Sequence, residues 1–506
     1  MSHPAAGNIL KSSYPFALAL DIGTSSVRAA LYDDGGNQLE QSFVKHERTL
    51  QTSLEGGAEL DALEALEQIE QAIDATLTRS AQFTERLEMV ASSCFWHSLV
   101  GVGRDGRAVT PVLTWADTRA ASAVAELKEI FDERETHART GCRFHPSYWP
   151  AKLLWLRRER ADVFRSAARW MSLSDLLLER FFGETKTSVS MASATGLFDQ
   201  RTLAWDEEML SRLGVASEQL SPIAARSKTF SGLKQEYARR WPQLRASRWT
   251  AATGDGAANN IGAGCATPER AALMIGTSGA MRVMWSGDAP ALIPPELWCY
   301  RADSERVIMG GALSDGGGLY HWMTDALNLK ASDEELESKL ALMQPDAHGL
   351  TVLPFWSGER STGWNAEARG AILGVKQHTQ PLEILRAAME AVAYRFALIS
   401  EALESEAPHA VLVASGGALR SSPVWTQILS DVLGREIRLS EAREASSRGA
   451  VLLALELAGK IKSITDVPAL LGRTFEPDAT RHARYRDGLE RQQKFYERLV
   501  IEPQRR

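Results

Sequence analysis

The stretch FALALDIGTSSVRAALYDD (residues 16–34) places Gly-Thr-Ser between two short apolar runs. This order predicts a buried strand over 16–20, a tight turn, and a returning strand over 27–32. The four letters IGTS at 22–25 return at 275–278, in ALMIGTSGAMRVMW, again between two apolar runs. The two copies lie half of the 506-residue chain apart. The sequence therefore predicts a duplicated α/β domain.

The pattern around each copy supports this duplication. Apolar residues three or four apart predict an amphipathic helix in each half, and short apolar runs predict further strands. The expected elements are, in chain order, a helix over 60–77, a strand over 87–92, strands over 271–275 and 280–284, a helix over 381–404 and a strand over 410–415. Alternating strands and helices indicate layered α/β domains. We place them at residues 1–250 and 251–506.

Composition narrows the class of protein. The chain has 44% hydrophobic residues, 24% charged residues and a net charge of −7, which is typical of a soluble globular protein. The negative charge argues against nucleic acid or an anionic membrane as a partner. Four scattered cysteines without CxxC spacing indicate reduced thiols rather than a disulfide framework or a zinc site. With no apolar leader at the start and no run of 18 apolar residues, we expect a cytoplasmic protein.

Each Gly-Thr-Ser turn offers backbone N–H groups and hydroxyls with little side-chain bulk, which is a suitable cradle for phosphate. Two facing cradles could hold a polyphosphate in the cleft between the domains. Asp21 precedes the first copy, whereas Met274 precedes the second. One carboxylate is enough to hold Mg²⁺ together with phosphates, but from spacing alone a turn cap at the strand end explains Asp21 equally well. The P-loop and the GxGxxG dinucleotide motif are both absent from the sequence.

Motifs in this order resemble the FGGY family of carbohydrate kinases, whose two domains share the actin-like ATPase (ribonuclease H-like) fold with a ligand cleft between them. The likeness runs from about residue 16 to about residue 480. The matching segments are LDIGTSSVRAALYDDGG (20–36) and MIGTSGAM (274–281) for the two phosphate loops, VASGGALRSSPVW (413–425) for the adenosine motif, and GAILGVKQHTQPLEILRAAMEAVAY (370–394) for the C-terminal signature.

Within the family, the resemblance is strongest to gluconokinases. The segments that carry it are WHSLVGVGRDGRAVTPVLTWADTRA (96–120), RTGCRFHP (139–146), SMASATGLFD (190–199) and LPFWSGERSTGWNAEARG (353–370). Trp96 is larger than the methionine that gluconokinases typically have before the His-Ser pair. This departure lies near the expected sugar pocket, so it leaves the identity of the sugar open.

The segment TGDGAANN (253–260) resembles the catalytic loop of the family. The resemblance implies that Asp255 is the general base that takes the proton from the attacking sugar hydroxyl. A carboxylate in a glycine-flanked turn can approach a small substrate closely. Taken alone, the same residues also fit an ordinary turn, because Asp-Gly is a common turn dipeptide.

The resemblance also implies a binding site for Mg-ATP. Asp21 would hold Mg²⁺, and the glycines of the adenosine motif would leave room for the nucleotide, where a side chain would collide with it. The expected nucleotide-binding residues are Thr24, Ser25, Ser26 and Thr277 at the phosphates, and Gly416, Gly417 and Ser421 at the adenosine. Gly317, in SDGGGLYHW, is a further candidate, although a triple glycine also suits a flexible hairpin.

For the sugar, Trp96, His97 and Asp117 match the substrate loop of the family. Gluconate carries a carboxylate, so its pocket should offer cations or hydrogen-bond donors. His97, His145 and Lys152 are the candidates at matching positions. His145 can equally be a packed, hydrogen-bonded residue, and Lys152 can be structural.

These features predict an ATP-dependent kinase that converts D-gluconate to 6-phosphogluconate, with a hinge near residue 250 that closes the domains over the substrates. Another FGGY specificity, for xylulose or another polyol, stays open as an alternative. An actin- or Hsp70-like ATPase that acts on proteins is disfavoured, because it has no need of the cluster of Trp96, His97, Trp115 and Asp117. We expect a small-molecule sugar or sugar acid as partner and leave the number of subunits open, a homodimer included.

Overall fold

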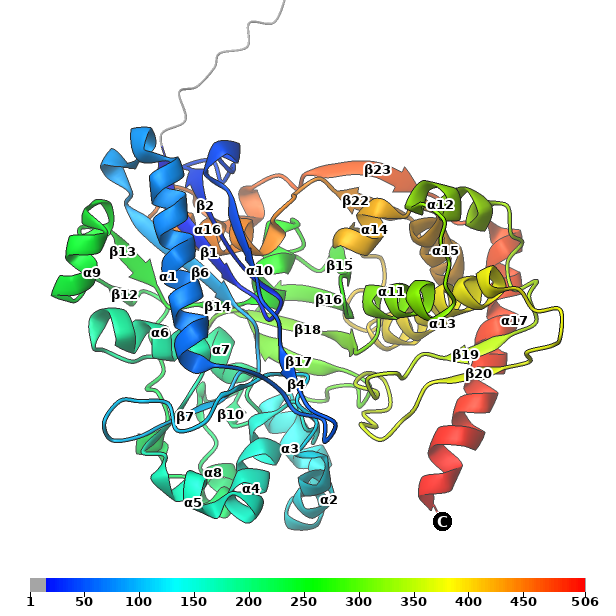
Figure 1. The fold of residues 1–506 in the computed structure, drawn as a ribbon, viewed down its shortest axis with the longest axis horizontal. Helices are drawn as coiled ribbons and strands as arrows, with labels where there is room; N and C mark the ends of the chain where they lie inside the picture. Colours follow the sequence, from blue (N-terminus) through cyan, green and yellow to red (C-terminus); the bar gives the residue numbers. More distant parts are fainter. Residues whose placement is uncertain (1–14, 506) are drawn as a thin grey trace, which may run out of the picture.

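The computed structural model describes residues 15–505, without the side chains of 84–86 and 504–505, and it contains two seven-stranded sheets (Figure 1). In the first sheet, β1 pairs antiparallel with β2 and parallel with β6. Its strands are, in spatial order, β12 (Thr229–Phe230), β13 (Arg248–Thr250), β6 (Met89–Cys94), β1 (Pro15–Ile22), β2 (Ser26–Asp33) and β3 (Val44–Glu47), and β14 (Thr253–Gly254) also pairs with β6.

The second sheet repeats this arrangement, because β15 pairs antiparallel with β16 and parallel with β21. Its strands are, in spatial order, β17 (Trp298–Arg301), β18 (Arg306–Leu313), β16 (Gly279–Ser286), β15 (Arg270–Ile275), β21 (Val411–Ser415), β22 (Ile437–Ser440) and β23 (Leu471–Phe475). Each IGTS turn therefore joins the two central antiparallel strands of its own sheet. The duplicated α/β fold predicted from the repeat is confirmed.

The long predicted helices are also confirmed. The one expected over 60–77 is α1 (Ala62–Arg79), whose N-cap Asp61 accepts a hydrogen bond from the backbone N–H of Glu64. The one expected over 381–404 is α13 (Pro381–Ala402), which lies in the core of the second half. Residues 1–14, where the sequence predicts no secretory leader, lie outside the described residues.

Two helices join the halves. α10 (Asp255–Gly262) and α16 (Ala445–Leu457) cross so closely that glycine is required on both: a Cβ at Gly262 would lie 1.8 Å from the carbonyl oxygen of Ala445, and one at Gly449 would lie 1.8 Å from that of Ala258. α16 packs into the core of the first sheet although it comes from the second half of the chain. Figure 1 shows both helices near the middle of the molecule.

The expected domain boundary lies close to the end of the first sheet. Strands β13 and β14 both pair in parallel with β6, so the first sheet continues to Gly254 and the boundary expected at residue 250 falls among paired strands. Asp255 follows at once as the first residue of α10. The catalytic candidate therefore lies where the chain passes from one half to the other.

A helical region of the first half contacts the second half. It contains α2 (Ala121–Ile130), α3 (Glu133–Thr140), α4 (Trp149–Glu159), α5 (Ala161–Ser166) and α8 (Glu207–Leu213), which lie along the bottom of Figure 1, from the left to the centre. These helices contribute to a hydrophobic core of their own. The backbone N–H of Cys299 in β17 donates to the carbonyl of Gly141 at 2.9 Å, so this region contacts the second half directly.

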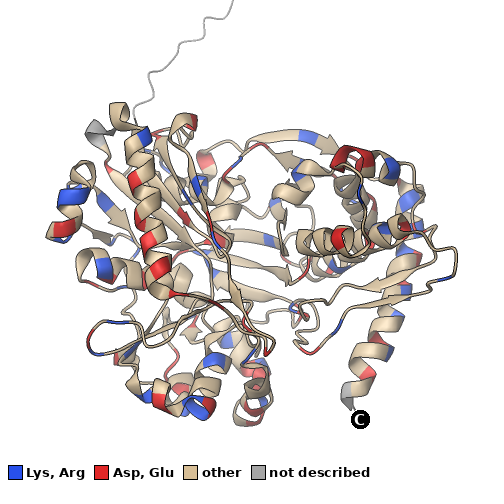
Figure 2. Cartoon of the chain, viewed as in Figure 1, with Lys and Arg blue, Asp and Glu red and all other residues tan. Residues whose placement is uncertain are grey.

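The surface carries charge of both signs. Figure 2 shows basic and acidic residues interspersed along the exposed helices. Among the described residues, no helix combines the length and the apolar character that crossing a membrane requires.

Candidate active site

A cavity between the two halves brings together residues that lie far apart in the sequence. Its walls are largely aromatic, and Asp255 lines it. The lining side chains are Trp96, His97, Trp115, Ser147 and Tyr148 from the first half and Asp255, Arg282, Trp298, Tyr300, Arg360 and Trp364 from the second half, among others. The hydroxyl groups of Tyr148 and Tyr300 lie 2.5 Å apart, so a hydrogen bond joins the halves at this cavity.

Asp255 is the first residue of α10 rather than part of a simple turn, which corrects the interpretation of TGDGA as a turn. Its Oδ1 accepts a hydrogen bond from the backbone N–H of Gly256 at 2.7 Å. Burial raises the pKa of the carboxyl group to about 6, with a smaller rise from nearby Asp21, while the cation of Arg282 opposes the rise. A general base is most effective when its pKa lies near the working pH. The side chain is therefore suited to accept a proton near neutrality.

Trp96 explains why glycines flank this aspartate. A Cβ at Gly254 would lie 1.7 Å from the indole Nε1 of Trp96, and one at Gly256 would lie 2.3 Å from the same ring. The indole N–H donates to the carbonyl of Ser190 at 3.0 Å, and the ring packs edge-on against Tyr300 with centroids 5.2 Å apart. Trp96 thus forms a fixed apolar wall beside Asp255.

His97 offers a hydrogen-bond acceptor to the cavity. Its Nδ1 lies 2.6 Å from the carbonyl oxygen of Ala194, which can only accept, so the proton resides on Nδ1. Burial lowers the pKa of the imidazole to about 3, which keeps it neutral. Nε2 is then free of a proton and can accept a hydrogen bond from a sugar hydroxyl.

Three of the predicted sugar ligands, Lys152, Asp117 and His145, are not among the residues that line the cavity, and their role in sugar binding stays a prediction. Each of these side chains forms hydrogen bonds with other groups of the protein. The Nζ of Lys152 donates to the carbonyls of His97 and Thr114 at 3.0 and 2.8 Å. The carboxylate of Asp117 accepts from the backbone N–H of Ala58 at 3.3 Å and from Arg119, and Nδ1 of His145 lies 2.9 Å from the hydroxyl of Ser147.

Two arginines that are not among the predicted site residues line the cavity. Arg282, on β16, is 3% exposed, and its Nε and Nη2 have no hydrogen-bond partner among the described residues. Arg360 donates from Nη2 to the carbonyl of Leu313 at 2.8 Å and lies over the ring of Trp115, while its Nε has no partner in the described chain. The alternation of strand residues after the second IGTS turn, which places Ala280 and Arg282 on one face, is the signal that could have revealed Arg282.

The two phosphate turns place three of the four predicted phosphate-binding residues at their tips. Thr24 and Ser25 lie at the tip of the first turn, and Thr277 is exposed at the tip of the second. Ser26 is 1% exposed and begins β2, so its hydroxyl lies inside the sheet edge rather than at the tip. Gly317 is not part of a hairpin but begins α11 (Gly317–Ala326), whose first N–H groups bond to the carbonyls of the second turn.

The adenosine motif contains two glycines with different roles. Gly416 has φ of 96°, and a Cβ there would lie 2.3 Å from the carbonyl oxygen of Ile275, so the backbone itself requires glycine. At Gly417 a Cβ would meet no atom within 4 Å and would enter open space. The hydroxyl of Ser421 donates to the carbonyl of Gly417 at 2.9 Å. An open face at Gly417 is the feature expected beside a bound nucleotide.

Comparison with known proteins identifies the family to which this chain belongs. The N-terminal domain model of the FGGY family of carbohydrate kinases matches residues 16–262, and the C-terminal domain model matches residues 271–457. The chain belongs to the FGGY family of carbohydrate kinases. Its two halves have the actin-like ATPase architecture of that family, and its reaction is transfer of a phosphoryl group from ATP to a small-molecule sugar.

The relatives of this kinase differ in the sugar that they are named for. Gluconokinase of Bacillus subtilis (strain 168) is 29% identical over 475 residues, covering 91% of each chain. Gluconate kinase from Lactobacillus acidophilus has a TM-score of 0.88 at 26% identity, with 97% of this chain and 99% of that chain covered. Ligand-bound xylulose kinase from the same organism also has a TM-score of 0.88 at 26% identity, with 96% and 99% covered. Likeness alone does not fix the sugar.

Asp21 has the chemistry that a Mg²⁺ ligand in a kinase needs. It lies at the end of β1, beside the first phosphate turn, and is 4% exposed. Oδ1 accepts from the hydroxyl of Ser93 at 2.6 Å and Oδ2 from Arg28 at 2.9 Å, which fixes the carboxylate in one orientation. Magnesium bound with nucleotide phosphates typically takes only one or two protein carboxylates. The donor set therefore fits the ion.

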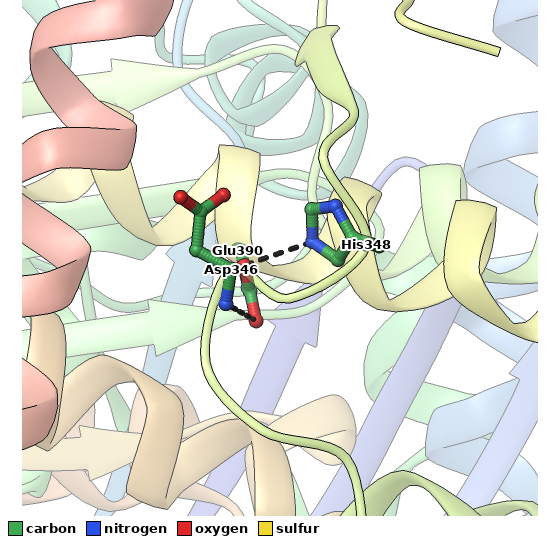
Figure 3. Close-up of side chains that lie close together, drawn as sticks. All are labelled: Asp346, His348 and Glu390. Atoms are coloured by element: carbon green, nitrogen blue, oxygen red, sulfur yellow. Dashed lines mark hydrogen bonds and ion pairs between the residues drawn. The ribbon is translucent and has the colours of Figure 1, made fainter.

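A second cluster of possible metal ligands lies in the C-terminal half of the kinase (Figure 3). Asp346, His348 and Glu390 bring ligand atoms within 4.8 Å of one another. Nε2 of His348 is hydrogen-bonded to Glu390 at 3.1 Å, Arg386 contacts Glu390 at 2.7 Å, and Arg491 pairs with Asp346. Arg386 and Arg491 pair with the two carboxylates, so the described contacts of this cluster are those of a charge network that joins α13 to its neighbours.

Gly417→Ala tests the nucleotide site of the kinase. The added methyl group enters space that no described atom occupies, so the variant is expected to fold with unchanged or slightly higher stability. It is expected to raise the KM for ATP about tenfold, equivalent to about 1.4 kcal/mol of binding, and to leave the KM for the sugar unchanged. Steady-state kinetics at varied ATP and varied sugar measures both values. An unchanged KM for ATP removes Gly417 from the nucleotide site.

Proposed function

We propose that this kinase phosphorylates the sugar acid D-gluconate and produces 6-phosphogluconate. The observation that carries the proposal is Arg360: its guanidinium lines the cavity, and its Nε has no partner among the described residues. Arg360 is only partly exposed, so its guanidinium requires a compensating anion beside it. Because arginine binds carboxylates through paired N–H groups, a sugar acid satisfies this requirement and a neutral polyol does not.

The reaction follows from the side chains around the cavity. The carboxylate of Asp255 takes the proton of the sugar hydroxyl as the oxygen attacks the γ-phosphorus of ATP. The bond from the γ-phosphorus to the bridging oxygen breaks, and ADP leaves with that electron pair. Asp21 would hold Mg²⁺ with the phosphates, and the ion supplies neutralisation of their charge when bound. The aromatic walls exclude water, which would otherwise compete with the sugar for the phosphoryl group.

The acceptor at the other side of the cavity supports a polyhydroxylated substrate. Neutral His97 presents Nε2 as an acceptor, and Lys152 fixes the backbone of His97 by its bond to the carbonyl oxygen. A sugar hydroxyl can donate to this nitrogen. The same contact also suits xylulose, so it does not separate the two candidate sugars. The unpartnered Nε of Arg360 is what supports gluconate.

Release of ADP with Mg-ATP and a panel of acceptors tests the proposal. The panel contains D-gluconate, D-xylulose, L-ribulose, glycerol and a blank without sugar. We expect turnover that depends on D-gluconate and far exceeds that with the other acceptors. Faster turnover with a neutral sugar would contradict the sugar-acid assignment while keeping the kinase reaction. Release of ADP that ignores every acceptor would contradict both.

Arg360→Gln is expected to raise the KM for D-gluconate about 10- to 100-fold, because a hydrogen bond to a charged group contributes about 1.5–3 kcal/mol. The KM for ATP should be unchanged. Arg369→Gln is the matched control, since Arg369 lies on the same segment with its side chain 68% exposed. Equal effects of the two substitutions on the KM for D-gluconate would exclude Arg360 as the carboxylate ligand.

A further inference from the structure

Arg282 is a buried cation that the proposed sugar site does not use. It lies on β16 and is 3% exposed, and Nε and Nη2 of its guanidinium have no hydrogen-bond partner among the described residues. Burial lowers its pKa to about 10, so the side chain is still charged at neutral pH. A charged group with unused N–H donors in a buried place is costly unless an anion joins it.

The surroundings of Arg282 are shaped to hold this side chain. A Cβ at Gly310 would lie 2.7 Å from its Cγ, and a Cβ at Gly256 would lie 2.2 Å from its Nη1. Two glycines from different elements thus clear the path of the side chain to the cavity. The amide of Asn260 donates to the backbone carbonyl of Arg282 at 3.3 Å, which fixes the base of the side chain. These contacts therefore direct the side chain of Arg282 into the cavity.

The groups around the guanidinium of Arg282 indicate which anion it can bind. On one side lies Asp255: Arg282 opposes the rise of the pKa of that carboxyl group, so the two charges interact. Among the described residues no ion pair joins them, so both stay available to a third group. On the other side, Ser278 and Gly279 of the second phosphate turn line the same cavity, and Gly279 begins the strand that carries Arg282. The guanidinium thus interacts with Asp255 and lines the same cavity as the second phosphate turn.

We propose that Arg282 is a catalytic residue that binds the γ-phosphoryl group of ATP while it passes to the sugar. In this step Asp255 takes the hydroxyl proton, the bond from sugar oxygen to γ-phosphorus forms, and the bond from γ-phosphorus to the bridging oxygen of ADP breaks. Arg282 keeps its proton throughout. Its N–H groups neutralise the charge on the non-bridging oxygens, which is where stabilisation accelerates phosphoryl transfer.

This role requires the kinase reaction and Asp255 as base, but not a particular sugar. It differs in this respect from the role of Arg360, which depends on a carboxylate in the substrate. The two arginines therefore have separate roles in the cavity. The guanidinium of Arg360 binds the carboxylate of the sugar acid, and that of Arg282 binds the phosphoryl group that is transferred.

The test compares Arg282→Gln, Arg282→Lys and Arg360→Gln, each with D-gluconate and with the best neutral acceptor. Arg282→Gln is expected to lower kcat about a hundredfold, the effect typical of losing one donor to a developing oxyanion. The loss should be the same for both acceptors, with the KM for the sugar little changed. Arg282→Lys, which keeps the charge, should recover part of kcat.

The pH profile gives a second readout that a structural role would not move. The charged or titratable groups facing Asp255 are Arg282 on β16, Asp21 on β1, Cys94 on β6 and Arg360. Removing the cation of Arg282 leaves Asp21 and burial to raise the pKa of Asp255, so the acidic limb of kcat/KM should move to higher pH in Arg282→Gln. Arg282→Lys should leave the limb near its wild-type position.

Three outcomes would overturn the proposal. One is wild-type kcat in Arg282→Gln. Another is a higher KM for D-gluconate with normal turnover of the neutral acceptor, which would make Arg282 a carboxylate ligand instead. The third is an equal loss in both variants without any shift of the acidic limb, which would indicate a structural role. Thermal unfolding of each variant, with and without ATP, separates misfolding from these results. Failure of the sugar-acid assignment alone would alter only the results for Arg360→Gln.

Discussion

Replacing Asp255 by asparagine is expected to lower kcat by about two to four orders of magnitude, the range over which positioned general bases contribute. The substitution removes the proton acceptor but keeps the size of the side chain. The amide oxygen of asparagine can still accept the bond from the N–H of Gly256 that Oδ1 now accepts at 2.7 Å. The start of α10 and the affinity for ATP should therefore survive, and the loss should fall on turnover.

The pH dependence gives this prediction a second part. The base works only as a carboxylate, and burial raises its pKa to about 6. In the wild-type enzyme, kcat/KM should therefore be full above this pH and fall as the pH drops below about 6. The residual activity of Asp255→Asn should lack this acidic limb, because the titrating group is gone. Measurements of kcat/KM from pH 5 to 8 on both proteins check this.

Asp199→Asn is the matched control for the charge change. Asp199 also accepts hydrogen bonds from backbone N–H groups, those of Arg201 and Thr202 at 2.8 and 3.2 Å, but does not line the cavity. This variant should keep wild-type turnover. Near wild-type turnover in Asp255→Asn would exclude the aspartate as the base, and loss of ATP binding together with turnover would assign it a structural role.

The strands, the turns and the duplication could be predicted from the sequence, because each depends on neighbouring residues. The IGTS turns lie between antiparallel strands as expected, and the apolar runs that flank them are almost entirely buried. Sequence motifs also located Trp96, His97 and Asp255 at the cavity. In each of these cases the decisive residues lie within one short stretch of chain, or within two matching short stretches.

The rest of the site could not be predicted, because it depends on contacts between distant segments. Arg360 is available to the cavity because its neighbour Glu359 pairs with Arg395 and accepts a hydrogen bond from Tyr496 at 2.7 Å. Lys152 lies in a matching motif, yet its charge is directed to backbone carbonyls in two other loops. Spacing along the chain contains no information on which partner a long charged side chain will reach.

Gly449→Ala should cost at least about 2–3 kcal/mol of folding free energy, at the upper part of the range for overpacked cores. The new methyl carbon would lie 1.8 Å from the carbonyl oxygen of Ala258 and 2.9 Å from the N–H nitrogen of Gly262. Both are backbone atoms of α10, so no side-chain rotation relieves the overlap, and the two helices must separate. Differential scanning calorimetry should show a lower Tm for this variant.

The same substitution should also reduce activity, because α10 begins with Asp255 and its displacement moves the base. We therefore expect kcat to fall even at temperatures where the variant is folded, with the KM for ATP less affected. Gly417→Ala is the control for stability, since it adds the same methyl group in open space. A Tm within one degree of the wild type, at about the precision of such a scan, would mean that α10 and α16 are free to move apart. The crossing would then be a hinge between the halves rather than a rigid support for the catalytic aspartate.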